Sequence, residues 1–177
     1  MEKQNKTQLI LKIMNVLFWI VFIGLCIKTG TSIFALYTVV TNEGLEDVVY
    51  IGSNSFERLN LSLPYFLPIA LISIIILSLK TYISYVVIKI STTLDLINPF
   101  TLTTSRLISK ISHLALMVGV FQISAHSYYL SLLSKDEVKN SIGNGSGEFL
   151  FLAGIIFIIA QIFKRGLELQ SENELTI

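Results

Sequence analysis

The chain has 177 residues, of which 53% are hydrophobic and only 14% are charged, and its formal net charge is +1. Its mean hydropathy is +0.70. Soluble domains carry about 25% charged residues, so this composition excludes an ordinary soluble domain and indicates a chain that a lipid bilayer solvates. The small net charge gives no general attraction to nucleic acid, and direct nucleic-acid binding is not expected. The single cysteine, Cys26, excludes an internal disulfide and is predicted to be a small packed hydrophobic residue.

The first apolar run extends from Leu9 to Ile27 and follows a short basic segment at the N-terminus. A secretory signal peptide has the same order of segments. This run, however, is long for a signal peptide, and no Ala-x-Ala-like cleavage site follows it. We therefore expect a membrane anchor, with a transmembrane helix over about residues 9–29.

The second apolar run predicts a transmembrane helix over about residues 63–89. Pro64 and Pro68 lie near its start, where a proline costs a helix least. Lys80 interrupts the run and leaves two interpretations open. Either Lys80 lies deep in the bilayer, or the span ends just before it and the helix continues past the membrane. We favour the second interpretation, because Tyr82 follows Lys80 and tyrosine is typical of the membrane interface.

The third apolar run is the most polar of the four and predicts a transmembrane helix over about residues 107–133. The fourth predicts a span over about residues 148–165, ending at a basic pair, Lys164 and Arg165. The sequence therefore predicts an all-α integral membrane protein with one membrane domain over residues 1–177, a four-helix bundle of four transmembrane helices.

Residues 30–63 form a long predicted outer loop. Asp47–Ile51 is typical of a short strand, Gly52–Ser55 of a turn and Phe56–Leu61 of a returning strand, so we expect a small β-hairpin here. One interpretation is a lid that senses a ligand or peptide, and the other, which we favour, is a solvated connector. A second outer loop, residues 134–147, is rich in glycine and serine, which is typical of a flexible connection.

The placement of lysine and arginine predicts the orientation, because these residues are more frequent in cytoplasmic segments. With four spans, both termini lie on one side. That side holds eight of the thirteen basic residues: Lys3, Lys6, Lys12, Lys89, Arg106, Lys110, Lys164 and Arg165. The other side holds four, Lys28, Arg58, Lys135 and Lys139, and Lys80 is left over. Both termini are therefore predicted to be cytoplasmic.

Two cytoplasmic segments follow from this orientation. The inner hairpin tip, residues 91–105, contains Pro99, which disfavours a helical conformation at the residue before it. Thr101, Thr103 or Thr104 can then cap the next helix. The cytoplasmic tail, residues 166–177, is acidic but keeps scattered apolar residues up to its end, which indicates a tail that docks on another surface.

The sequence of the tip and the tail resembles a known bacterial family. The resemblance rests on Asn98–Thr101, on Arg106 with Leu107, on Ile162–Leu169 and on Glu172–Ile177. The family is numbered twenty-nine seventy-five among domains of unknown function, and the likeness extends from about Asn98 to the end of the chain. It implies a multi-pass protein of the bacterial inner membrane with four spans and no assigned activity. It also implies a gene often placed beside a small helix-turn-helix regulator of the Cro/repressor type.

The residues most like the family all fall on the predicted cytoplasmic side, which motivates a regulator or sensor that binds such a helix-turn-helix protein. The candidate partner-binding residues are Asn98, Pro99, Phe100, Thr101, Arg106, Lys164, Arg165, Gly166, Glu172, Asn173, Glu174 and Leu175. Association into a homo-oligomer stays open, although no GxxxG motif supports it.

Motifs for catalysis or metal binding are absent from the sequence, so neither an enzyme nor a cofactor is expected. His113 and His126 are thirteen positions apart on one helix, roughly 20 Å, which is too far to share a metal. Gln122 and His126 share one helix face and form a candidate intramembrane polar site, which would suit a small transporter or channel component. The other interpretation, which we favour, is hydrogen bonding between helices.

Overall fold

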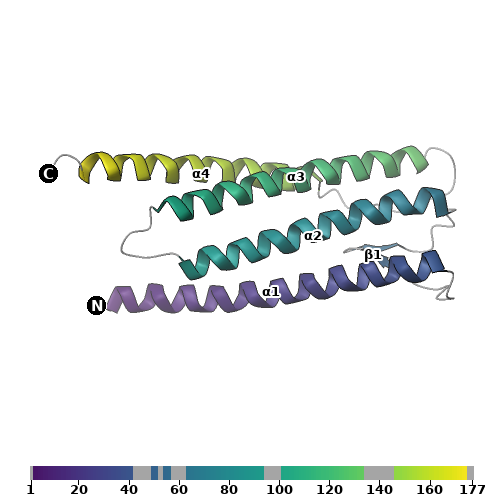
Figure 1. The fold of residues 1–177 in the computed structure, drawn as a ribbon, viewed down its shortest axis with the longest axis horizontal. Helices are drawn as coiled ribbons and strands as arrows, with labels where there is room; N and C mark the ends of the chain where they lie inside the picture. The colour runs from purple at the N-terminus through teal and green to yellow at the C-terminus, as the bar shows by residue number, and fades with distance from the viewer. Residues whose placement is uncertain are drawn as a thin grey trace.

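The structure is a computed structural model that describes residues 2–41, 49–51, 54–56, 63–93, 101–133 and 146–174 (Figure 1). Its helices are α1 (Glu2–Thr41), α2 (Leu63–Thr93), α3 (Leu102–Leu133) and α4 (Ser146–Glu174). Each helix contains a segment long and apolar enough to cross a membrane: Leu9–Thr41, Leu67–Thr93, Leu102–Tyr128 and Phe149–Glu172. This confirms the prediction of four helices that can span a bilayer.

The helices are long because a backbone in lipid must satisfy its own hydrogen bonds. Pro64 lies in the first turn of α2, where its missing N–H costs no intrahelical bond, and only Pro68 lies inside the helix. Hydroxyl side chains within the apolar segments donate to carbonyls of their own helix. Ser78 Oγ, for example, donates to the Ile74 carbonyl at 2.8 Å. The helix α2 is continuous through Lys80 to Thr93, and its apolar span includes Lys80.

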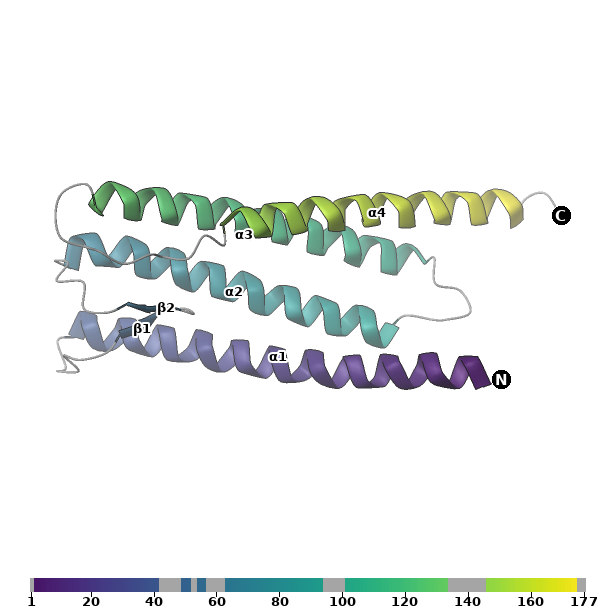
Figure 2. The same cartoon turned by 180° about the vertical axis from the view of Figure 1, so that it is seen from behind.

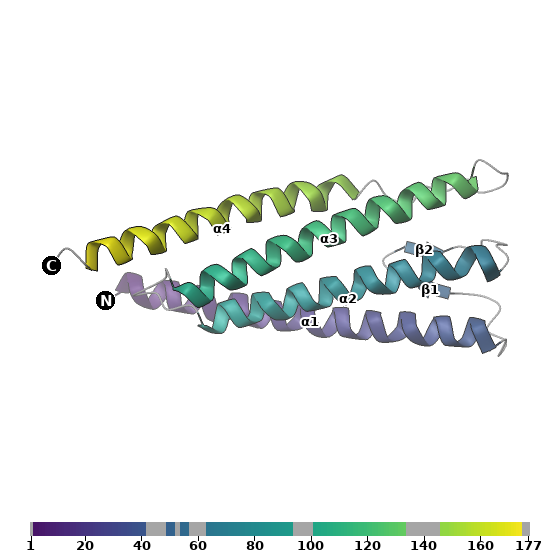
Figure 3. The same cartoon turned by 45° about the horizontal axis from the view of Figure 1, so that its top comes forward.

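The four helices form a row and not a closed ring. Packing joins α1 to α2, α2 to α3 and α3 to α4, while among the described residues no close backbone approach joins α1 to α3 or α4, or α2 to α4. Figures 1 and 3 show α1 and α4 at opposite edges of this row. The two inner helices therefore have two helical neighbours each, and the two outer helices have one.

The buried hydrophobic side chains of the described residues all lie on α2, α3 and α4. They are Ile69, Ala70, Ile76, Leu77, Val86, Ile88, Ile111, Ala115, Val118, Ala153 and Ala160. On α1 no hydrophobic side chain of this kind is found among the described residues. Cys26 is exposed, so its prediction as a packed residue is wrong. An edge helix turns most of its surface outward, where lipid and not protein covers it.

The seam between α3 and α4 is closely packed at Gly119. A Cβ atom built on Gly119 would lie 2.7 Å from Cδ2 of Leu150 and 3.3 Å from its backbone nitrogen. Ala115, Val118 and Ala153 are each at most 2% exposed. Small residues at a membrane helix seam let the two backbones approach closely, and this packing holds α4 onto α3.

Two short strands precede α2. Strand β1 (Val49–Ile51) pairs antiparallel with β2 (Asn54–Phe56), with Val49 opposite Phe56 and Ile51 opposite Asn54. The predicted returning strand began at Phe56, so the observed β2 starts two residues earlier. Figure 2 shows the pair beside the ends of α1 and α2 that lie away from the chain termini. The remainder of the predicted outer loop lies outside the described residues.

The helices are staggered along their length. All three views show that the start of α1 and the end of α4 project beyond the end of α2 and the start of α3 (Figures 1–3). Figure 3 shows that α4 begins part-way along α3, which agrees with the contact between Gly119 and Leu150. The start of α1, the end of α2, the start of α3 and the end of α4 therefore lie at one end of the molecule, called the tip end below.

Candidate functional site

The start of α3 shows how the tip is built. The backbone N–H of Thr104 donates to Thr101 Oγ1 at 3.2 Å, the Ser105 N–H donates to the Thr101 carbonyl at 3.0 Å, and the two threonine hydroxyls are 2.8 Å apart. Thr101 is therefore the helix cap, which decides between the three threonines that the sequence offered. Thr104 is only 2% exposed. The other predicted tip residues, Asn98, Pro99 and Phe100, lie outside the described part of the chain.

Replacing the capping hydroxyl should loosen the first turn of α3. We expect Thr101→Ala to lower the free energy of unfolding by about 1 kcal/mol, because the Thr104 N–H loses its acceptor. Thr103→Ala is the matched control, since Thr103 is exposed and does not cap the helix. Amide hydrogen exchange over residues 102–105 should rise in the first variant only. Equal exchange in both variants would contradict the capping role.

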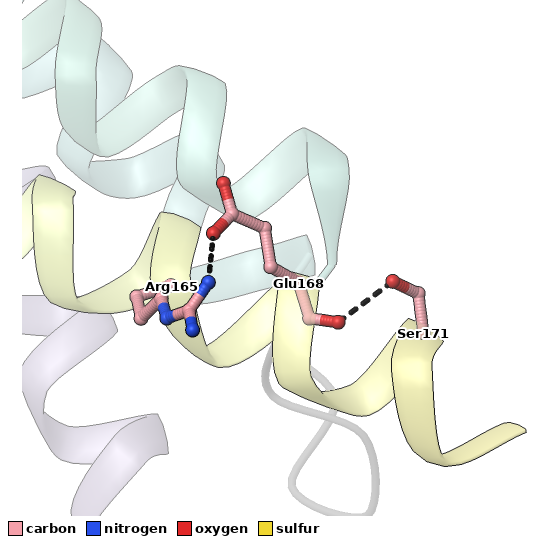
Figure 4. A network of polar contacts seen from close by, with 3 residues as sticks. All are labelled: Arg165, Glu168 and Ser171. Atoms are coloured by element: carbon pink, nitrogen blue, oxygen red, sulfur yellow. Dashed lines mark hydrogen bonds and ion pairs between the residues drawn. The ribbon is translucent and has the colours of Figure 1, made fainter. Parts of the chain in front are cut away.

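The predicted tail is a direct continuation of α4. The helix passes through Gly166 without a break and ends at Glu174, so the expected boundary between span and tail at residue 166 is not a structural boundary. Arg165 Nη1 donates to Glu168 Oε2 at 2.8 Å, and Ser171 Oγ donates to the Glu168 carbonyl at 2.8 Å (Figure 4). Both contacts stay within the helix, so they support the tail without using a neighbour.

The tail presents charged and apolar side chains outward. Lys164, Arg165 and Glu172 are exposed, Gly166 is half-buried, and the apolar Ile162 and Leu169 are 61% and 46% exposed. Asn173 and Glu174 belong to the last turn of α4, and Leu175 lies beyond the described residues. Arg106 is exposed near the start of α3. The predicted partner-binding residues that are described thus lie at the tip end, on α3 and α4.

The predicted intramembrane site is only partly assembled. Gln122 and His126 are both half-buried on α3, but no hydrogen bond joins them within the described part of the chain. The Gln122 Oε1 atom is buried and has no hydrogen-bond partner there. His113 Nδ1 lies 2.7 Å from the Ser109 carbonyl of its own helix. Of the polar residues of this helix, Ser112 reaches across to α4, where its Oγ lies 3.4 Å from the Ala153 carbonyl.

A polar cluster between α1 and α2 was not predicted from the sequence. Thr29 Oγ1 and Thr81 Oγ1 lie 3.2 Å apart across the seam, and the residues before them, Lys28 and Lys80, interact electrostatically. The Lys80 Nζ atom lies 4.5 Å from the centre of the Phe149 ring at the start of α4. The sequence signal is a repeated Lys-Thr pair that interrupts an apolar run on each helix.

A further lysine side chain, that of Lys110, lies between α2 and α3. The Lys110 Nζ atom donates to the Tyr82 hydroxyl and lies 4.8 Å from the centre of its ring. Tyr82 in turn stacks on Tyr85, with ring centres 6.3 Å apart. Throughout the described ranges, no three His, Cys, Asp or Glu side chains come close enough together to hold a metal ion. In the described part of the chain, Lys28, Lys80 and Lys110 are thus lysines of the apolar segments without a carboxylate partner.

Comparison with known proteins places the chain in a family. No curated protein and no solved structure matches it. A sequence family does match, over residues 50–177, which include β2, α2, α3, α4 and all but the first residue of β1, but not α1. This match covers well over half of the chain and agrees with the resemblance found in the tip and the tail. The chain therefore belongs to the family described as Protein of unknown function (DUF2975).

Proposed function

We propose that the protein is a regulator or sensor of the bacterial inner membrane that binds a cytoplasmic protein at its tip end and has no catalytic role. The observation that carries the proposal is that α4 is one continuous helix. Its acidic last turns extend past the end of α2 and the start of α3 (Figure 1). A tail that is already helical loses little conformational freedom on binding, so more of its contact energy contributes to affinity.

The orientation is supported by the positions of the basic residues. Lys12, Lys89, Arg106, Lys164 and Arg165 all lie in the half of their helix that is nearer the tip end. An excess of lysine and arginine is typical of the cytoplasmic side. Both termini therefore belong in the cytoplasm in this proposal, where a soluble partner can reach the tail.

The charge of the tail indicates the chemistry of the partner. Glu168 and Glu172 are exposed, and Glu174 follows two residues later as the last residue of the same helix. A small helix-turn-helix regulator has a basic surface for DNA, which is complementary to these carboxylates. Binding of the tail to that surface would compete with DNA, so the membrane protein would hold its partner away from its operator.

The test begins with the wild-type protein purified from native membranes, and mass spectrometry identifies any helix-turn-helix protein that remains bound. Binding of that purified partner is then measured with the membrane protein in nanodiscs. Replacing residues 167–177 by a flexible Gly/Ser segment of equal length should weaken binding more than about tenfold, as expected when several interface contacts are lost. The membrane segments remain intact in this variant.

Two further variants test whether the partner recognises the charge of the tail or its helical shape. Glu168→Gln with Glu172→Gln keeps the length of the helix but removes two carboxylates, and should reduce both the affinity and its dependence on salt. Ser171→Ala is the matched control, because it keeps every charge of the tail and loses only one contact to the Glu168 carbonyl. Equal binding by the Gly/Ser tail and the wild type would overturn the proposal.

A second candidate function, a small transporter or channel component, is favoured by one observation. The buried Gln122 Oε1 atom lacks a partner in the described part of the chain, and an unpaired polar group at membrane depth is a default functional hypothesis. Flux of small solutes and protons into proteoliposomes tests it. Gln122→Leu with His126→Leu should abolish flux. Ser124→Ala should not, because Ser124 Oγ donates to the Val120 carbonyl of its own helix at 3.0 Å.

A further inference from the structure

The two lysines at the seam of α1 and α2 lie on the same side of that seam. The Oγ1 atoms of Thr29 and Thr81 face each other across the seam at 3.2 Å, and Lys28 and Lys80 each precede one of these threonines by one residue. The helices run in opposite directions, so one step backward along each turns both side chains towards the same face. Their electrostatic interaction agrees with this placement.

The pair is cationic without a counter-charge. Both lysines are half-buried, and neither forms an ion pair with a carboxylate among the described residues. Two like charges held together repel each other, and the repulsion grows as the surroundings become less polar. The threonine hydroxyls beside them carry no charge to offset it, and each donates to a carbonyl of its own helix, Thr29 to Leu25 at 2.8 Å and Thr81 to Leu77 at 2.9 Å.

The position of the pair along the helices indicates what neutralises it. The apolar run of α1 from Leu9 ends at Ile27, directly before Lys28. Phe149 opens the apolar span of α4, and its ring lies beneath the Lys80 ammonium at 4.5 Å. The apolar spans of α1 and α2 continue past these lysines to Thr41 and Thr93. A lysine within a span extends its long side chain towards the membrane surface, where the phosphates of a bilayer lie.

We propose that Lys28 and Lys80 together bind a phosphate group, held between α1 and α2 beside the start of α4. Two ammonium groups on one face can share the oxygens of one phosphate, and the Phe149 ring keeps the Lys80 ammonium in place. The phosphate can belong to the headgroup of an anionic membrane lipid or to free inorganic phosphate. The site is distinct from the tail and does not depend on the regulatory role proposed above.

The test uses the full-length protein in a neutral detergent that contains no lipid. Phosphatidylglycerol, phosphatidylcholine or inorganic phosphate is added, and binding is followed by native mass spectrometry and by the melting temperature. We expect phosphatidylglycerol to bind and to raise the melting temperature. In Lys28→Gln with Lys80→Gln, its affinity should fall roughly thirtyfold, equivalent to about 2 kcal/mol at about 1 kcal/mol for each lysine.

Lys12→Gln with Lys89→Gln is the matched control, since it removes the same charge from the same two helices at exposed positions that are not paired. This control should bind phosphatidylglycerol as the wild type does. Lysine-dependent binding of inorganic phosphate would support the site and identify a soluble ligand. The proposal is overturned if neither phosphate source binds, or if the double variant at Lys28 and Lys80 binds as tightly as the control. Without added anion, that double variant should melt above the wild type, because the repulsion is gone.

Discussion

Gly119→Leu should separate α4 from α3. A Cβ atom at residue 119 would already lie 2.7 Å from Leu150 Cδ2 and 2.8 Å from Leu150 Cγ, and the backbone of Leu150 is close behind. A leucine cannot be accommodated by a rotation of one flexible side chain, so the backbones must move apart. Overpacking of this kind costs about 1–3 kcal/mol, and we expect at least that loss in the free energy of unfolding, measured by titration with a denaturing detergent.

The same substitution at Gly154 is the matched control. Gly154 lies on α4, but a Cβ atom there would meet nothing within 4 Å. Gly154→Leu should therefore unfold at the same detergent concentration as the wild type or at a higher one, since leucine favours a helix more than glycine does. If both variants were equally stable, the seam between α3 and α4 would not be packed as described.

A cysteine pair at residues 29 and 81 should form a disulfide almost completely. The hydroxyl oxygens of Thr29 and Thr81 are 3.2 Å apart, so two thiols at these positions start within reach of each other. The experiment uses a Cys26→Ala background, in which the variant contains no other cysteine. Mild oxidation in membranes should convert nearly all of the Thr29→Cys, Thr81→Cys protein into a faster-migrating form on a non-reducing gel.

The control pairs Thr31→Cys with Thr81→Cys. Thr31 is exposed, and its hydroxyl donates to the Lys28 carbonyl of its own helix at 2.9 Å, so a thiol there faces away from α2. We expect little cross-linking in this variant. A comparable yield from both pairs would show that α1 slides or rotates against α2. The pairing of Lys28 with Lys80 would then lose its geometric basis.

The helices themselves could be predicted from the sequence because one strong constraint decides them. Apolar runs in lipid must satisfy their backbone hydrogen bonds internally, and the runs beginning at Leu9, Tyr65, Ile111 and Phe149 are all helical in the structure. The cap of α3 was narrowed to three threonines, and Thr101 proved to be the residue used. Local chemistry was sufficient in both cases.

The arrangement of the helices could not be predicted in the same way. Membrane helices are apolar on all sides, so hydropathy does not tell which face meets a neighbour and which meets lipid. This is why Cys26 was expected to be packed but is exposed, and why Lys28 and Lys80 were considered separately although they lie together. The fourth span was expected to end at the basic pair Lys164 and Arg165, but the helix continues to Glu174.

The row of helices has a consequence for how the protein assembles. Each helix packs against the ones before and after it in the chain, and no close backbone approach in the described residues joins helices further apart in sequence. Contacts between chain neighbours close only short loops, so the contact order is low and the search for the native arrangement is fast. Each helix can dock on its predecessor as synthesis releases it into the bilayer. In the last of these steps α4 packs against α3 at Gly119, where the structure has no space for a larger side chain.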